Sequence, residues 1–151
     1  MNKSILTFCL LSGLLFLSCE EDPAVRQDAL VNYKVDLMGD WAIFSVERNG
    51  EDISALLDYS TFSLQLGDGT FSLANEQVPF PTLGFNDANF SSGAWEFDDD
   101  FSPTQIHFVD GGTRVPVQMS FPAYGLNNTS LGLEFSLGCS NTVYTYQFKK
   151  Q

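Results

Sequence analysis

Apolar and polar residues alternate along most of the chain beyond residue 38, which is the pattern of strands that bury one face. Strands of this kind belong in an antiparallel sheet whose polar face meets water. Short stretches rich in Gly, Asp, Asn and Ser separate most of them and supply turns. The pattern predicts eight strands, at about 39–48, 61–66, 71–73, 95–97, 106–108, 114–121, 130–137 and 144–148.

Eight consecutive strands joined mostly by short turns favour an all-β fold. We expect an eight-stranded antiparallel up-and-down barrel, because closure removes the exposed edges of a sheet. A two-sheet β-sandwich is the alternative. Ahead of the strands, Asp22 and Pro23 supply a cap and a first helical residue, and apolar residues then recur every fourth position as far as Leu37. This segment predicts one short N-terminal helix.

The apolar face of each strand predicts the core. In the first strand, Trp41, Ile43 and Ser45 share one face, while Phe44 and Val46 lie on the other. Further along the chain, the residues expected to be buried are Leu64, Phe97, Phe108, Phe121, Leu133 and Tyr146. The single histidine, His107, lies between two apolar neighbours and is therefore expected to face solvent.

The loops of an up-and-down barrel alternate between its two ends. The N-terminal helix enters at one end, so loops 49–60, 75–93, 110–112 and 138–141 are expected at the other. Loop 75–93 is the longest connection, and loops of this length are commonly functional. The candidate ligand-binding residues on these loops are Leu56, Leu57, Phe80, Leu83, Phe85 and Phe90. They are expected either to rim a mouth for an apolar ligand or to fold inward and plug the barrel.

Charge and composition narrow the classes of partner. The chain carries 19 acidic against 7 basic residues, a net charge of −12. Such a chain is repelled by nucleic acid and by anionic lipid head groups, which argues against a nucleic-acid partner. Its 14 phenylalanines argue against disorder at this charge.

The residue types that carry common catalytic and metal chemistry do not cluster along the chain. No His-Cys cluster is present for zinc or iron, and no serine lies in a nucleophile elbow. The run Asp98-Asp99-Asp100 is the strongest candidate for a cation, but consecutive residues of a turn point in different directions, so a solvated turn is expected. We therefore expect no enzymatic activity, no cofactor and no metal site.

The first 18 residues resemble a bacterial lipoprotein signal peptide. An apolar run from Ile5 to Leu17, too short to span a membrane, follows Lys3 and ends at Leu17-Ser18-Cys19. The resemblance implies cleavage before Cys19, with a diacylglycerol on its sulfur and an acyl chain such as palmitate on its amine. Loss of Lys3 would leave 6 basic and 19 acidic residues, a net charge of −13.

Two further stretches carry a more specific resemblance. Glu20-Glu21-Asp22 is similar to the export signal of surface lipoproteins of Bacteroidota, which implies an outer-membrane, cell-surface location. Leu37-Met38-Gly39-Asp40-Trp41 at the first strand and Tyr144-Thr145-Tyr146-Gln147-Phe148 at the last resemble the lipocalin-like lipoprotein domains of that group, mostly of unknown function. The implied organisation is a signal peptide over 1–18, an acidic tether and short helix over 19–36, and a barrel over 37–151.

Two functions remain open from the sequence. The first is a non-enzymatic interaction module, anchored in the membrane through Cys19, that meets a protein or glycan partner through the loops at the end away from the membrane. The second is a carrier or capture protein for a small apolar ligand inside the barrel. A filled barrel interior would favour the module, and an empty one the carrier.

Overall fold

The computed structural model describes residues 34–85 and 87–151, and within these ranges the chain forms strands and loops but no helix. The predicted N-terminal helix falls outside them, apart from residues 34–37, which are not helical. The strands are β1 (Gly39–Arg48), β2 (Glu51–Asp52), β3 (Ser63–Leu66), β4 (Thr70–Ala74), β5 (Leu83–Phe85), β6 (Ala88–Asn89), β7 (Ser92–Phe97), β8 (Gln105–Asp110), β9 (Thr113–Met119), β10 (Ser130–Phe135) and β11 (Tyr144–Lys150).

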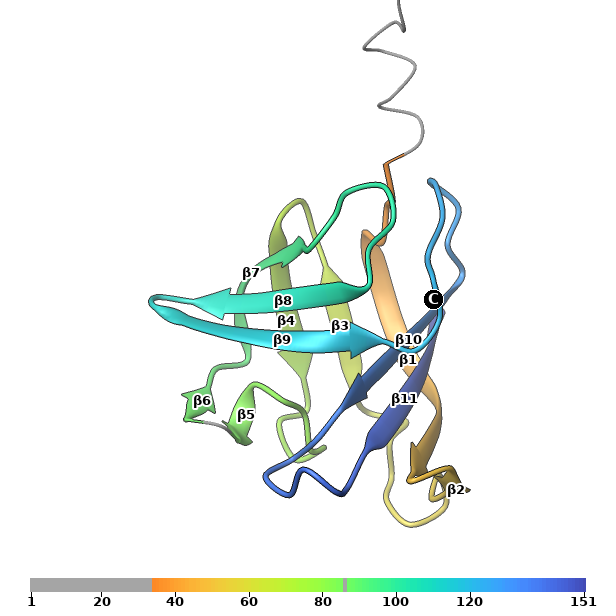
Figure 1. The fold of residues 1–151 in the computed structure, drawn as a ribbon. Helices are drawn as coiled ribbons and strands as arrows, with labels where there is room; N and C mark the ends of the chain where they lie inside the picture. The colour runs from red at the N-terminus through yellow and green to blue at the C-terminus, as the bar shows by residue number, and fades with distance from the viewer. Residues whose placement is uncertain (1–33, 86) are drawn as a thin grey trace, which may run out of the picture.

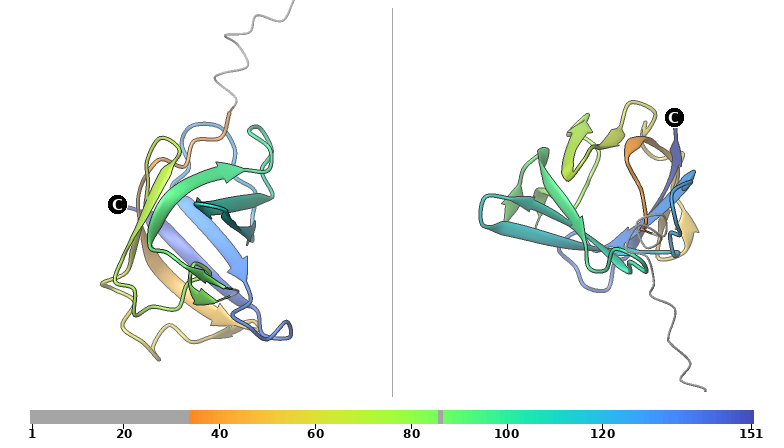
Figure 2. Two further views of the ribbon diagram at one scale, coloured as in Figure 1. Left: turned by 90° about the vertical axis from the view of Figure 1, so that its left-hand side faces the viewer. Right: turned by 90° about the horizontal axis from the view of Figure 1, so that it is seen from above.

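Eight of these strands close into an antiparallel up-and-down barrel, which confirms the predicted fold class (Figure 1). Each barrel strand pairs with the next along the chain, and β11 returns to pair with β1, so no edge is left open. Seen from above, the strands run around a ring (Figure 2). The short β2 extends the sheet beside β1, and β5 and β6 form a separate small hairpin within the longest loop. The β11–β1 pairing is what excludes the open two-sheet sandwich.

Aromatic and aliphatic side chains fill the interior of the barrel. Its largest fully buried side chains are Trp41, Tyr146, Phe62, Phe80, Phe108 and Phe148. Burying a side chain of this size contributes about 1.5–3 kcal/mol. The indole Nε1–H of Trp41 donates to the carbonyl oxygen of Leu37 over 2.8 Å, which fixes the chain where it enters the first strand.

A β-bulge in β1 corrects the predicted faces of that strand. Ile43 pairs with Phe148 and Ser45 with Gln147, so Phe44 is left between two consecutive pairings. The extra residue shifts the alternation by one position. Trp41 before the bulge and Val46 after it are therefore both fully buried, and Ser45 does not continue the inward face. Phe44 is 64% exposed and lies under the ammonium of Lys149.

Four of the six predicted core residues are confirmed, and two are half-buried. Leu64, Phe108, Leu133 and Tyr146 lie in the core, whereas Phe97 and Phe121 are only partly covered. Phe97 lines a cleft described below. Phe121 follows the end of β9, and its ring lies so close to Gly132 that a side chain there would collide with it. Glycine at position 132 is what permits this approach.

The prediction that His107 is exposed to solvent is wrong, because the residue is only 9% exposed. His107 does alternate with the buried Ile106 and Phe108, so it lies on the outer face of β8. There it is flanked by Pro116 of β9 and Glu96 of β7, and an Arg114–Glu96 ion pair of 3.0 Å spans β8 beside it. The imidazole Nδ1 has no hydrogen-bond partner.

Candidate functional site

The two ends of the barrel differ in which connections they carry. We call the end where residues 34–38 lie the near end, and the opposite one the far end. The β3–β4, β7–β8 and β9–β10 connections lie at the near end in Figure 1. Loops 49–60, 75–93 and 138–141 lie at the far end, as predicted, whereas the β8–β9 turn, also expected there, projects from the side of the barrel.

Phe80 plugs the far end. This residue of the longest loop is 0% exposed and packs against rings contributed by three separate parts of the barrel. Its ring centroid lies 5.7 Å from that of Phe62, 5.4 Å from that of Phe108 and 5.8 Å from that of Phe135. Rings at these separations make favourable edge-on and tilted contacts. The space beneath the loop is therefore filled by this aromatic cluster.

A partly buried hydrogen bond holds the plug in place. The Tyr146 hydroxyl donates to the carbonyl oxygen of Pro79 over 2.7 Å. Burial raises the pKa of Tyr146 well above its usual range, with smaller contributions from Tyr59 and Tyr144. The phenol therefore stays protonated and able to donate, and the loop backbone next to Phe80 is fixed to β11.

The other far-end candidates divide between the core and the solvent. Leu83 and Phe90 are partly buried against the core, and the Phe90 ring lies 6.0 Å from that of Phe71. The backbone of Phe85 belongs to β5, and its side chain lies outside the described part of the structure. Leu56 and Leu57 are 70% and 51% exposed, so they point away from the plug. Of the two predicted arrangements, Phe80 follows the plug, whereas Leu56 and Leu57 do not join it.

The loop that carries Leu56 and Leu57 is nevertheless well anchored. Tyr59 is buried, and its ring meets that of Tyr146 edge-on at 6.0 Å. On either side of the leucines, Asp52 accepts a hydrogen bond from the backbone of Ser54, and Asp58 accepts two from Ser60. The side chain and then the backbone of Ser54 lower the pKa of the Asp52 carboxyl, and the side chain and backbone of Ser60 lower that of Asp58. The two leucines are thus presented to solvent from a fixed loop.

A hollow also lies at the near end, where the sequence had not placed one. It is a cleft of about 660 Å³. We call it the near-end cleft and define it by its lining residues, which are Lys34, Val35, Asp36, Met38, Gly67, Asp68, Gly69, Trp95, Glu96, Phe97, Asp100 and Leu126. The only sequence signal for it is that Trp95 and Phe97 occupy alternate positions of one strand, because their closeness to the Gly67–Gly69 turn arises from the pairing of β4 with β7.

Trp95 forms a fixed wall of the near-end cleft. Its indole Nε1–H donates to the carbonyl oxygen of Gly67 over 2.9 Å, and its backbone N–H donates to that of Gly69 over 3.1 Å. Its ring meets the Phe97 ring edge-on, with centroids 5.0 Å apart. Both bonds attach the tryptophan to the β3–β4 turn. Because the only polar atom of the indole already forms a hydrogen bond, a ligand in the cleft would contact the aromatic ring.

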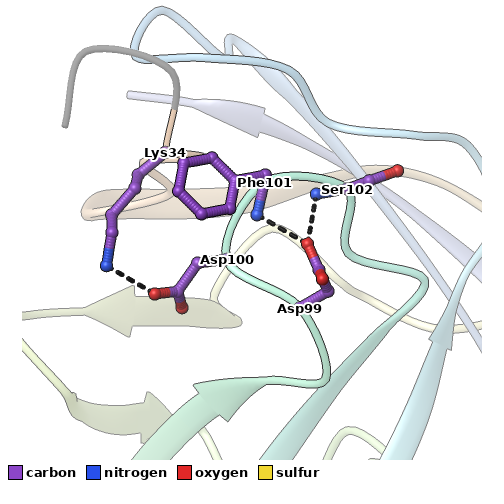
Figure 3. Close-up of polar contacts among 5 residues, drawn as sticks. All are labelled: Lys34, Asp99, Asp100, Phe101 and Ser102. Atoms are coloured by element: carbon purple, nitrogen blue, oxygen red, sulfur yellow. Dashed lines mark hydrogen bonds and ion pairs between the residues drawn. The ribbon is translucent and has the colours of Figure 1, made fainter. Parts of the chain in front are cut away.

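The strap formed by residues 34–38 also lines the cleft, through Lys34, Val35, Asp36 and Met38. Its backbone is attached to two near-end connections, since Val35 donates to the carbonyl oxygen of Asp100 over 2.8 Å and Asp36 donates to that of Gly125 over 2.9 Å. Lys34 forms an ion pair with the Asp100 carboxylate (Figure 3). The side-chain amide of Asn128 donates to both Asp36 and Gly125, which joins the strap to the β9–β10 loop.

The three adjacent aspartates of the β7–β8 connection each have a separate role. Asp99 accepts hydrogen bonds from the backbone N–H groups of Phe101 and Ser102, both over 2.8 Å, while Asp100 binds Lys34 (Figure 3). Asp98 accepts from Thr104 and Gln105. Desolvation acts to raise the pKa of Asp98, but these hydrogen bonds prevail and lower it to about 2.

Other features of the described residues bear on chemistry. Within residues 34–85 and 87–151, no group of three or more His, Cys, Asp and Glu side chains is arranged to hold a metal ion. No helix among them is long and apolar enough to cross a membrane. Cys19, the predicted site of lipid attachment, lies outside the described residues.

Comparison of the chain with protein-family models, with curated proteins and with solved structures finds no match.

Proposed function

We propose that this protein is a non-enzymatic interaction module: a solid, lipocalin-like barrel that is anchored to the outer membrane through lipid on Cys19 and meets a protein partner through its far-end loops. The observation that carries the proposal is the complete burial of Phe80 among Phe62, Phe108 and Phe135. A carrier of the barrel type needs an empty, mostly apolar lumen. The aromatic cluster occupies that space.

The far-end loops supply a contact surface. Leu56 and Leu57 are exposed side by side on a loop that Tyr59 anchors, and exposed aliphatic side chains on a fixed loop are suited to the apolar centre of a protein interface. Exposed carboxylates of Glu51, Asp52 and Asp58 lie on the same loop. A partner surface with an apolar centre and basic rim would complement them.

The proposed anchor agrees with this orientation. The chain reaches the barrel at the near end, where Lys34 lies, so a lipid on Cys19 would attach to that end. Each buried methylene of an acyl chain stabilises membrane attachment by about 0.8 kcal/mol, and several chains hold a protein durably. The far-end loops would then face away from the bilayer.

Titration with an apolar fluorescent fatty acid tests whether the interior is filled. The protein is the full chain in its Cys19→Ser form, in detergent-free buffer. We expect no saturable uptake. The Phe80→Ala variant is the comparison, because it opens space in the same place, and it should gain uptake if it remains folded by near-ultraviolet circular dichroism. Saturable uptake by the unmodified barrel that persists after Trp95→Leu would locate the probe inside the barrel and favour the carrier.

The anchor and the contact surface are tested on cells. Cys19→Ser should move the protein from the membrane fraction to the soluble fraction and abolish labelling with an alkynyl fatty acid. A photoreactive residue at Leu57 should give a discrete cross-linked protein that Leu56→Asp removes, whereas the same residue at Ala94, exposed on the barrel wall, should give none. A variant that stays in the membrane without Cys19, or identical cross-linking from both positions, would contradict the proposal.

A further inference from the structure

The near-end cleft has the size of a small-molecule site. Its volume of about 660 Å³ falls within the roughly 300–1,000 Å³ of typical ligand pockets. Val35 and Phe97 line it, and Met38 and Leu126 stand about half exposed at its rim. A bound molecule with an apolar body would cover these side chains. Binding of such a molecule would remove apolar surface from water, which is favourable.

The aromatic wall adds a directional preference. The indole of Trp95 donates a hydrogen bond to the Gly67 carbonyl and packs edge-on against Phe97. These two contacts fix the orientation of its ring. The face of an indole is the best aromatic surface for a cation, because the ring quadrupole is negative there. A cation that enters the cleft can meet this ring without breaking a hydrogen bond of the protein.

The charges around the cleft point in the same direction. Lys34 forms an ion pair with Asp100, and Glu96 forms one with Arg114, so the charges of these four groups cancel. Asp36 and Asp68 also line the cleft, and neither has an ion-pair partner within the described part of the chain. The cleft thus keeps a negative charge of two carboxylates, which attracts cations and repels fatty acids and phosphates.

We infer that the near-end cleft binds a small organic cation with an apolar body, such as a quaternary ammonium or a protonated amine that carries a hydrocarbon group. The cationic centre lies against the Trp95 ring within reach of the Asp68 carboxylate, and the apolar group contacts Met38 and Leu126. A bare metal ion is the poorer fit, since no three ligating side chains converge there among residues 34–85 and 87–151. This inference concerns the other end of the barrel and does not rest on the proposed function.

Benzyltrimethylammonium is the probe, titrated into the full chain by calorimetry and by tryptophan fluorescence. The second tryptophan, Trp41, is fully buried, so a fluorescence change reports Trp95. We expect saturable binding with one site, about tenfold tighter than that of neutral benzyl alcohol, and no binding of anionic phenylacetate. Raising the salt concentration should weaken the binding of the cation alone.

Matched variants assign the binding to the cleft. Trp95→Leu should weaken benzyltrimethylammonium at least tenfold, while Trp95→Phe, which keeps an aromatic face, should retain most of it. Asp68→Asn should weaken it several-fold, and Asp110→Asn, at the exposed end of β8 outside the cleft, should leave it unchanged. Thermal unfolding of each variant shows that it is folded.

Three results would overturn the inference. They are the absence of saturable binding at millimolar probe, equal affinity for the cation and benzyl alcohol, and full binding by Trp95→Leu. The far-end variant Leu57→Asp should bind the probe normally. Failure of cross-linking at Leu57 and failure of cation binding at Trp95 are therefore separate outcomes.

Discussion

The two ends of this barrel are built from the same strands, yet one is filled and the other is hollowed. At the far end the connection between β4 and β7 is long enough for Phe80 to turn back into the interior. At the near end the β3–β4 turn is only three residues, Gly67 to Gly69, and cannot reach over the opening. The space left between this turn, Trp95 and the 34–38 strap is the near-end cleft. The long far-end connection thus carries the side chain that fills the barrel, and the short near-end turn carries none that does so.

The two ends are also held by different forces. The far end depends mainly on aromatic packing, with a partly buried hydrogen bond from Tyr146 to Pro79. The near end depends on several hydrogen bonds and an exposed ion pair that join the 34–38 strap to the connections around it. The far end should therefore respond to changes in side-chain volume, and the near end to changes in polar groups and pH.

The largest effect is expected from removal of the plug. Phe80→Ala should lower the free energy of unfolding by about 3–5 kcal/mol, because it deletes a fully buried ring and leaves a cavity. Urea denaturation measures the loss. Phe101→Ala, at an exposed near-end ring, is the control and should cost less than about 1 kcal/mol. A loss below about 1 kcal/mol for Phe80→Ala would mean that the far end is open.

A smaller effect is expected where the strap meets the near end. Asn128→Ala should lower the free energy of unfolding by about 1–3 kcal/mol, because it removes the side-chain bonds to the backbone of Asp36 and Gly125. Asn127→Ala, at an exposed neighbour that makes no such bond, should change stability by less than about 0.5 kcal/mol. Equal losses from the two variants would show that the strap adds nothing to stability.

The near end should also carry a pH dependence that Asp98 explains. Its folded-state pKa of about 2 lies below the ordinary 3.8, so its contribution to stability is present above pH 3.8 and is lost as the pH falls through about 2. Asp98→Asn should lower the melting temperature at neutral pH, and its difference from the unsubstituted protein should shrink between pH 4 and 2. A difference that is constant over this range would rule out the carboxylate as its cause.

The smallest effect on stability is expected at the exposed far-end loop. Leu57→Ser should change the free energy of unfolding by less than about 0.5 kcal/mol, because the side chain is half exposed and points away from the plug. The same substitution should weaken cross-linking to a partner. If urea denaturation instead gives a loss above about 1 kcal/mol, Leu57 belongs to the packing of the barrel and not to a contact surface.

The alternation of residues was sufficient to predict the strands of this protein. A strand places successive side chains on opposite faces, so a period of two identified all eight barrel strands and, in Leu64, Phe108, Leu133 and Tyr146, four of the six core positions named. Counting strands also placed loops 49–60, 75–93 and 138–141 at the far end, since consecutive connections of an up-and-down barrel change ends, although the β8–β9 turn projects from the side. These properties follow from the local geometry of a strand, so they can be read from the order of apolar and polar residues in a single sequence.

What only the tertiary structure decided depends on residues that are far apart in the chain. Phe80 turns inward because Phe62, Phe108 and Phe135 leave space for its ring, and the alternation carries no record of that space. His107 is covered by groups of the strands on either side, and the bulge at Phe44 is visible only from its pairing with β11. The near-end cleft likewise joins segments from Lys34 to Leu126. The alternation determined which side chains of the regular strands face inward, and long-range packing determined the bulge, the plug and which end of the barrel is filled.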